Sequence, residues 1–351
     1  MRRKRGQVSN AEQLLRLLLM HVAGGLSLGQ TVARAQARNL AKLNAMALHK
    51  RLCSSGRWLE ALCAHVLSEL QIVLGQQATH DYGGLRLRIL DATDVQEPGS
   101  TGTDWRVHYS IRLPELSCDF FTITDKHTAE TLLHLPVEPG DLVLVDRGYS
   151  DRKAVGQVMR LGGQVIMRYN SGAFPLQDER GRKLDPLDKL RHLTLGQAAE
   201  QEVYFQTLAG GVAQKARLCA LRKSPEQTLR NQVKIRARAS RSGVNVRQRT
   251  LDFAEFIVVL TTVEAHQIST GAVLEIYRGR WQIELAFKRL KSLLQLGQLP
   301  KSNPASSQAW MQGKILTALL IERQLCEARF LSPWGYPFGP DIPVDTIQRV
   351  P

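Results

Sequence analysis

Residues 277–291 read YRGRWQIELAFKRLK, and this stretch gives the first indication of how the chain folds. As a helix with about 100° per residue, it places four polar side chains on one stripe about 60° wide: Tyr277, Arg280, Glu284 and Lys291. A neighbouring apolar stripe that includes Phe287 is typical of a helix that packs on a core. The stretch therefore predicts one carboxylate between two cations and a phenol, where core meets solvent.

An ordinary surface ion pair is the alternative interpretation of this stretch. Glu284 lies four residues after Arg280 and four before Lys288. Such pairs are common on exposed helices and stabilise them by only about 0.3 to 0.5 kcal/mol. A functional role for Glu284 therefore depends on further carboxylates elsewhere in the chain.

Two aspartates follow apolar runs that predict buried strands. In LRLRILDATDV, residues 85–95, the alternating pattern predicts a strand that ends at Asp91 or just after it. In DLVLVDRGY, residues 141–149, the continuous run before Asp146 is typical of a strand buried on both faces. Asp94 is the alternative to Asp91 if the first strand ends later. Both carboxylates are expected to point into one cleft.

The order of predicted elements indicates an α/β protein with five parts. Residues 1–76 read as helices and are expected to form a DNA-binding domain, with an ordinary bundle as the alternative. Residues 85–170 predict three strands and then a strand, a helix and a parallel strand. Residues 171–255 predict a basic, β-rich insertion. Residues 256–330 predict a last strand and two helices that complete the core, the first helix carrying Glu284, and residues 331–351 predict an irregular tail.

Charge indicates a polyanionic partner. Forty-seven Lys and Arg against 32 Asp and Glu give a net charge of +15 and a pI near 9.9. Residues 215–249 carry eleven Lys or Arg and the single acid Glu226, which favours a DNA-facing surface over a solvated charge run. A membrane is the alternative partner, but no apolar run is long enough to span one. Five cysteines without a CxxC pair predict a reducing compartment.

Carboxylates at strand ends and on an adjacent helix would form an all-oxygen site. Mg²⁺ prefers such ligands, and Mn²⁺ can substitute for it. Two such ions, about 3.5 to 4 Å apart, stabilise the attacking and leaving oxygens of a displacement at phosphorus. The expected cofactor is therefore Mg²⁺.

The spacing Tyr-x2-Arg-x3-Glu-x6-Lys, together with LDATD and VDRGY, resembles the bacterial DDE transposases of the insertion sequence 4 family. The resemblance covers roughly residues 85–330 and implies a ribonuclease H-like core with a β-rich basic insertion, preceded by an α-helical domain. It implies three metal ligands: Asp91, Asp146 and Glu284. Six residues are predicted to contact DNA, the last by stacking a flipped base: Tyr277, Arg280, Lys291, Arg147, Arg168 and Phe256. A structural ion pair is the alternative for Arg168, and a buried strand position for Phe256.

The resemblance implies cleavage at the terminal inverted repeats of an insertion sequence and transfer of the 3′ ends to target DNA, by a homodimer in the synaptic complex. The expected location is the bacterial cytoplasm, at the nucleoid. Two alternatives remain: an inactive or domesticated DNA-binding relative, and a ribonuclease H-like nuclease without strand transfer.

Overall fold

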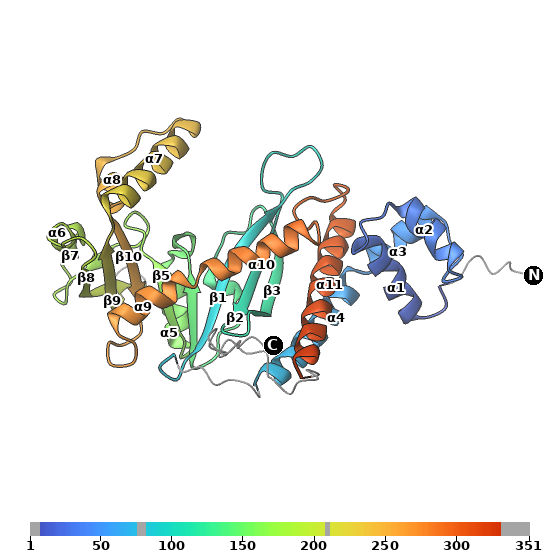
Figure 1. The fold of residues 1–351 in the computed structure, drawn as a ribbon, viewed down its shortest axis with the longest axis horizontal. Coiled ribbons are helices and arrows are strands. Elements are labelled where there is room, and N and C mark those ends of the chain that lie inside the picture. Colours follow the sequence, from blue (N-terminus) through green and yellow to red (C-terminus); the bar gives the residue numbers. More distant parts are fainter. Residues whose placement is uncertain (1–7, 76–81, 208–210, 331–351) are drawn as a thin grey trace, which may run out of the picture. The chain divides into compact units, whose positions relative to one another are not determined.

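The computed structural model describes residues 8–75, 82–207 and 211–330, which belong to two compact units (Figure 1). One unit contains residues 77–96 and 100–289. The other contains residues 1–76, 97–99 and 290–351.

A single ten-stranded sheet organises the unit of residues 77–96 and 100–289. Its strands lie in the order β3 (Ser117–Asp125), β2 (Trp105–Arg112), β1 (Arg86–Val95), β4 (Asp141–Val145), β5 (Gln164–Arg168), β10 (Phe256–Thr261), β9 (Ala213–Arg222), β8 (Ala198–Gln206), β6 (Leu176–Gln177) and β7 (Lys183–Leu184). The β1–β4 and β4–β5 pairs are parallel and the others antiparallel.

The predicted meander and crossover are both present. Strands β1, β2 and β3 pair in sequence, and residues 113–116 form the turn between the last two. Helix α5 (Arg152–Arg160) then connects the parallel strands β4 and β5. Its N-cap is Asp151, whose side chain accepts a hydrogen bond from the Lys153 amide and so satisfies one free N–H of the first turn. Two short 3₁₀ helices flank β4: η1 (Leu132–His134) and η2 (Arg147–Tyr149).

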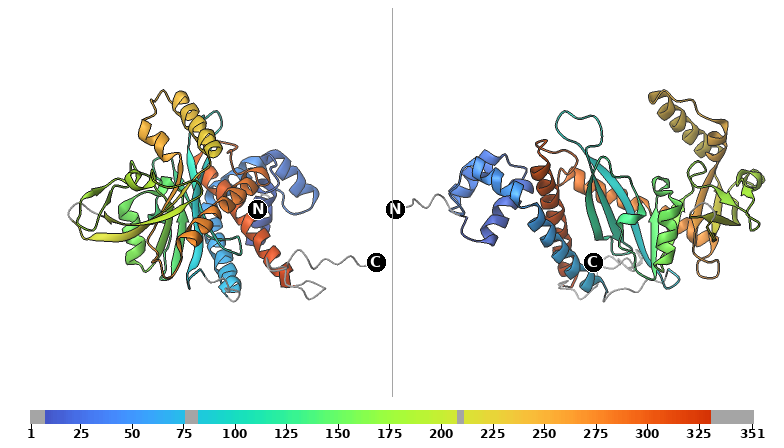
Figure 2. Two further views of the ribbon diagram at one scale, coloured as in Figure 1. Left: turned by 60° about the vertical axis from the view of Figure 1, so that its left-hand side comes forward. Right: turned by 180° about the vertical axis from the view of Figure 1, so that it is seen from behind.

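Helices cover both faces of the sheet near β4 and β5. Leu90 and Val145 belong to one apolar core with Val155 and Val158 of α5. Helices α9 (Thr270–Arg278) and α10 (Trp281–Ser292) follow β10, and α9 with the start of α10 lies on the face opposite α5 (Figures 1 and 2). This arrangement gives each face of the central strands a different set of neighbours.

The basic insertion is only partly β-rich. Strands β8 and β9 are the main β part of the insertion, and they extend the main sheet. The most basic segment is instead helical, with α7 (Pro225–Arg241) and α8 (Gln248–Phe253) after the short α6 (Leu187–Leu190). Figure 1 shows α7 extending away from β10, and none of its 17 residues is buried. The prediction of a β-rich segment was wrong here, because a mostly polar helix has no apolar periodicity to reveal it.

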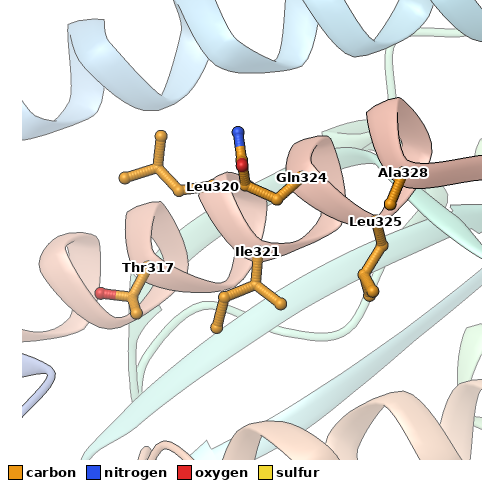
Figure 3. Close-up of a pocket in the computed structure, with 6 residues that line it drawn as sticks. All are labelled: Thr317, Leu320, Ile321, Gln324, Leu325 and Ala328. Atoms are coloured by element: carbon orange, nitrogen blue, oxygen red, sulfur yellow. The ribbon is translucent and has the colours of Figure 1, made fainter. Parts of the chain in front are cut away.

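The other unit is helical. It contains α1 (Ala11–Val22), α2 (Leu28–Ala37), α3 (Ala45–Ser54), α4 (Gly56–Gly75) and α11 (Pro304–Phe330). Helix α11 packs along α4 and α3, so residues 290–330 group with the N-terminal helices, whereas the sequence pattern assigned them to the core. Figure 3 shows a shallow hollow on α11 that carries no ionisable side chain, lined by Thr317, Leu320, Ile321, Gln324, Leu325 and Ala328. Among the described residues, no helix is long and apolar enough to cross a membrane.

Candidate active site

The register of two parallel strands brings Asp91 and Asp146 together. Ile89 of β1 pairs with Leu144 of β4, and two further residues along each strand lead to Asp91 and Asp146. Neighbouring strands lie about 4.8 Å apart, so the two residues are close neighbours. Because side chains alternate between faces, both aspartates lie opposite Leu90 and Val145, on the face that α9 and α10 cover. The predicted pairing of the two aspartates is therefore supported by strand register.

Asp91 does not end its strand. Strand β1 continues to Val95 by pairing with β2, and Asp91 itself lies opposite Tyr109. Pairing with β4 extends only as far as Ile89 on β1. Asp91 therefore lies two residues beyond the shared β1–β4 segment, where the two strands separate and a site can form. The sequence pattern predicted the end of β1 too early, because it did not reveal how far β2 extends.

The Asp91 carboxylate carries charge in a partly buried position. Its Oδ1 accepts a hydrogen bond from the Ala92 amide at 2.8 Å, and its Oδ2 lies 3.2 Å from the Arg280 guanidinium. Burial, with smaller contributions from the Asp146 and Glu130 carboxylates, raises the pKa of Asp91 to about 6, although the Ala92 amide and Arg280 act in the opposite direction. Burial, more than the neighbouring charges, therefore disfavours the ionised form of Asp91.

Arg280 connects Glu284 to this pair. Its guanidinium donates to Glu284 Oε1 at 2.7 Å and to Asp91 at 3.2 Å, so one cation bridges two of the three predicted ligands. The Glu284 side chain is 61% exposed. No group of three or more Asp, Glu, His or Cys side chains within the described ranges is close enough to hold a metal ion. Direct coordination by Glu284 therefore stays a prediction.

The helix that carries these residues is broken. Helix α9 ends at Arg278, and α10 begins at Trp281, with a turn at Gly279 and Arg280. The single continuous helix assumed for residues 277–291 was therefore wrong. The break leaves Arg280 between the two helices, from which its side chain reaches both Asp91 and Glu284.

Tyr277 lies beside the second aspartate. Its hydroxyl is 3.3 Å from Asp146 Oδ1 and donates a hydrogen bond to it. Burial raises the pKa of Tyr277 to about 12, helped by the Asp146 charge, while Arg168 and Arg280 act in the opposite direction. Tyr277 and Arg280 therefore contact the two aspartates from α9 and the following turn, and Arg168 of β5 lies near Tyr277.

The other predicted DNA contacts have different surroundings. Arg147 is exposed immediately after Asp146. Lys291 belongs to the other compact unit, where its side chain lies near Gly297, and its role stays a prediction. Phe256 is only 1% exposed, begins β10, and has the Arg222 guanidinium 5.8 Å from its ring centroid. The buried-strand alternative is correct for Phe256, and the expected base stacking is not supported.

Three residues near the aspartates were missed from the sequence. Glu130 follows β3 in an irregular segment, Arg106 is paired in register with Asp94, and Tyr149 ends η2. Arg106 Nε lies 3.4 Å from Asp94 and 3.6 Å from Glu130. Glu130 had no periodic pattern to mark it, since its position depends on a turn.

Comparison with known proteins shows which family the chain resembles. Residues 122–321 match the family model described as "Transposase DDE domain". The chain is 32% identical to the putative transposase InsL of insertion sequence element IS186A from Escherichia coli K12, over 91% of this chain and 86% of that protein. It is also 32% identical, with the same coverage, to the transposase of IS421 from Escherichia coli.

Among solved structures, the piggyBac transposase synaptic complex with hairpin DNA matches with a TM-score of 0.39 and 7% identity, over 95% of this chain and 84% of that one. The family model covers more than half of the chain, and the Escherichia coli relatives match along most of its length. The chain therefore belongs to the DDE-domain transposases of insertion sequences.

Proposed function

We propose that this protein cleaves DNA at the terminal inverted repeats of its insertion sequence and transfers the freed 3′ ends to target DNA, as in the insertion sequence 4 family. The observation that carries the proposal is the juxtaposition of Asp91 and Asp146 on parallel strands, with Arg280 bridging Asp91 to Glu284. The strand order β3-β2-β1-β4-β5 supports a ribonuclease H-like core.

The site residues fit a hard divalent cation. Their donors are carboxylate oxygens, and the raised pKa of Asp91 reflects its burial and, to a smaller extent, the charges of Asp146 and Glu130, all of which a bound cation would offset. Asp91 and Asp146 would hold Mg²⁺ or Mn²⁺, with Glu284 joining them. When bound, such ions stabilise the attacking and leaving oxygens of displacement at phosphorus.

The chain's own cations would bind the substrate. Arg280, Arg168 and Arg147 lie on or next to the elements that carry the aspartates, and Lys291 follows on α10. Tyr277 holds Asp146 through its hydroxyl. In the first step water attacks the phosphodiester at the element's end and the 3′ oxygen leaves. In the second step that 3′-OH attacks a target phosphodiester, so that one P–O bond forms as another breaks.

Helix α7 extends the DNA surface beyond the site. It carries five exposed cations and one acid, and it packs no buried residue against the protein. These cations are Arg230, Lys234, Arg236, Arg238 and Arg241. Cations on such a helix would bind the phosphates of duplex DNA, and this binding would be largely independent of the DNA sequence. Synapsis of two element ends by this route would require a homodimer.

Cleavage of a labelled duplex that carries the element's end tests the proposal. The wild-type protein should nick the end with Mg²⁺ and not with chelator, while Glu284→Ala should bind the end without nicking it. Cleavage retained by Glu284→Ala would contradict the site assignment. Binding without metal-dependent cleavage by the wild type would favour an inactive relative, and cleavage without joining to target DNA would favour a nuclease.

A further inference from the structure

Glu130 brings an additional carboxylate to the end of β4. It lies in the segment between β3 and η1, far from Asp146 in sequence. A Cβ added at Gly148 would lie 2.7 Å from Glu130 Oε2, closer than real contacts allow. The Glu130 carboxylate therefore rests against the backbone two residues after Asp146, and a side chain at position 148 would displace it.

Arg106 holds the Glu130 segment in place but offsets the charge of only one of the two carboxylates that it faces. The Arg106 guanidinium donates to the Thr128 carbonyl at 2.8 Å, which anchors the turn before Glu130. Its Nε faces both Glu130 and Asp94, at 3.6 and 3.4 Å. One cation thus serves two carboxylates. Burial raises the pKa of Glu130, Arg106 lowers it, and Asp94 and Asp146 raise it, so the Glu130 carboxylate lies near both of these aspartates.

Tyr149 provides an independent observation at the same place. Its side chain is 1% exposed, and its hydroxyl has no hydrogen-bond partner among the residues that the structure describes. Burial raises the pKa of Tyr149, and the charges of Asp91, Glu130 and Asp146 also raise it, so the hydroxyl lies near all three carboxylates. An unpaired buried hydroxyl is unfavourable, and a water or an ion-bound ligand at the carboxylates would give it a hydrogen-bond partner.

A purely structural ion pair explains less. It accounts for the contact between Arg106 and Glu130, but not for the clearance that Gly148 gives the carboxylate. It also leaves the Tyr149 hydroxyl buried without a partner. A hydrated cation beside Asp146 would explain both the position of the Glu130 carboxylate next to Gly148 and the unpaired hydroxyl of Tyr149.

We propose that Glu130 is a fourth carboxylate of the divalent-cation site and that Tyr149 is its positioning residue, whose hydroxyl donates to the ligands between Asp146 and Glu130. This inference rests on the proposed function. It adds a residue from the β3–η1 segment to a site otherwise formed by β1, β4 and α10. Loss of an outer ligand partner commonly weakens metal affinity about 10- to 100-fold.

Binding of Mn²⁺ to the full-length protein, followed by electron paramagnetic resonance without DNA, tests the proposal. Glu130→Gln and Tyr149→Phe should each weaken Mn²⁺ binding about tenfold or more. Glu138→Gln, which removes an exposed carboxylate on another loop, is the matched control and should bind as the wild type does. Glu130→Gln and Tyr149→Phe should also need correspondingly more Mg²⁺ than the wild type for half-maximal cleavage.

A second variant acts on Glu130 without replacing it. Gly148→Ala should displace the Glu130 carboxylate and reproduce the loss of Mn²⁺ affinity. Tyr149→Phe should unfold at a temperature equal to or above that of the wild type, because it removes an unpaired buried hydroxyl. A purely structural Tyr149 would instead lower that temperature and leave Mn²⁺ binding unchanged.

The outcomes separate this inference from the proposed function. If Asp91→Asn abolishes Mn²⁺ binding and Glu130→Gln binds like Glu138→Gln, the proposal for Glu130 is overturned while the proposed function stands. If the wild-type protein binds no Mn²⁺ and cleaves no DNA, the proposed function fails and this inference fails with it.

Discussion

Arg88 is the buried cation that ties β1 to β4, and its removal should destabilise the sheet that positions the aspartates. Its side chain is 7% exposed and lies 2.8 Å from Asp141 and 2.5 Å from Asp119, with a further hydrogen bond to the Pro136 carbonyl. Arg88 precedes Asp91 on β1, and Asp141 begins the strand that leads to Asp146. The ion pair therefore spans the two strands whose register forms the site.

Replacing Arg88 with Met should cost about 3 to 5 kcal/mol. Met preserves much of the apolar stem but leaves two buried carboxylates short of a partner, and breaking a buried pair commonly costs that much. Asp141 keeps Arg86 at 3.0 Å and the Glu138 amide, so most of the penalty should fall on Asp119. For a unit of about 200 residues, the unfolding temperature should fall by roughly 6 to 20 °C.

Thermal unfolding followed by circular dichroism measures this effect. Arg278→Met, which breaks an exposed pair with Glu275, should change the unfolding temperature by less than about 2 °C. Adding Asp119→Asn to Arg88→Met should recover at least about 1 kcal/mol, since the uncompensated charge is removed. An Arg88→Met protein as stable as Arg278→Met would refute the assignment of Arg88 as a buried tie between the strands.

Three further predictions concern other parts of the chain. Lys314 is fully buried over Trp310, and burial lowers its pKa from 10.5 to about 8. Between pH 8 and 10.5 the unfolded chain binds more protons than the folded protein, so the free energy of unfolding rises with pH across that window. At pH 7, Lys314→Met should raise the free energy of unfolding by about 1 to 3 kcal/mol, and urea unfolding should show this difference shrinking by pH 10. Because Phe256 is a core residue, Phe256→Ala should lower the free energy of unfolding by about 3 to 5 kcal/mol, and Phe256→Leu should leave DNA affinity unchanged. A selective loss of end cleavage in Phe256→Leu would instead support the base-stacking role. Replacing Arg230, Lys234, Arg236 and Arg238 of α7 with Gln should reduce the slope of log affinity against log salt concentration by up to about 3.6. Replacing the exposed Arg180 and Lys183 with Gln is the control. An α7 variant with the same slope as this control would contradict the proposal that α7 binds DNA.

Strand patterns predicted the core of the fold well. The apolar run before Asp146 and the alternation before Asp91 correspond to β4 and β1, and the crossover through α5 is as expected. These features depend on local periodicity, which the sequence displays directly. The pairing of Asp91 with Asp146 followed from the same pattern, because parallel neighbours carry equivalent positions side by side.

Features that depend on tertiary partners could not be predicted. The break at Gly279 and Arg280 was missed because residues 277–291 have an uninterrupted helical periodicity. Helix α7 lacks an apolar stripe, and α11 gives no sign in its own sequence that it packs on α4. Glu130 reaches the site through a turn held by Arg106, a contact between segments that no local pattern reveals.

Metal-dependent cleavage of the element's end by single Asp→Asn variants is the most direct measurement of the central claim. Asp91→Asn and Asp146→Asn should each lose cleavage by a factor of about 100 to 1,000 or more while keeping DNA affinity and unfolding temperature. Asp94→Asn, on the same strand as Asp91 but paired with Arg106, should cleave within about fivefold of the wild type. Cleavage retained by Asp91→Asn, or lost only in Asp94→Asn, would contradict a catalytic site formed by Asp91 and Asp146.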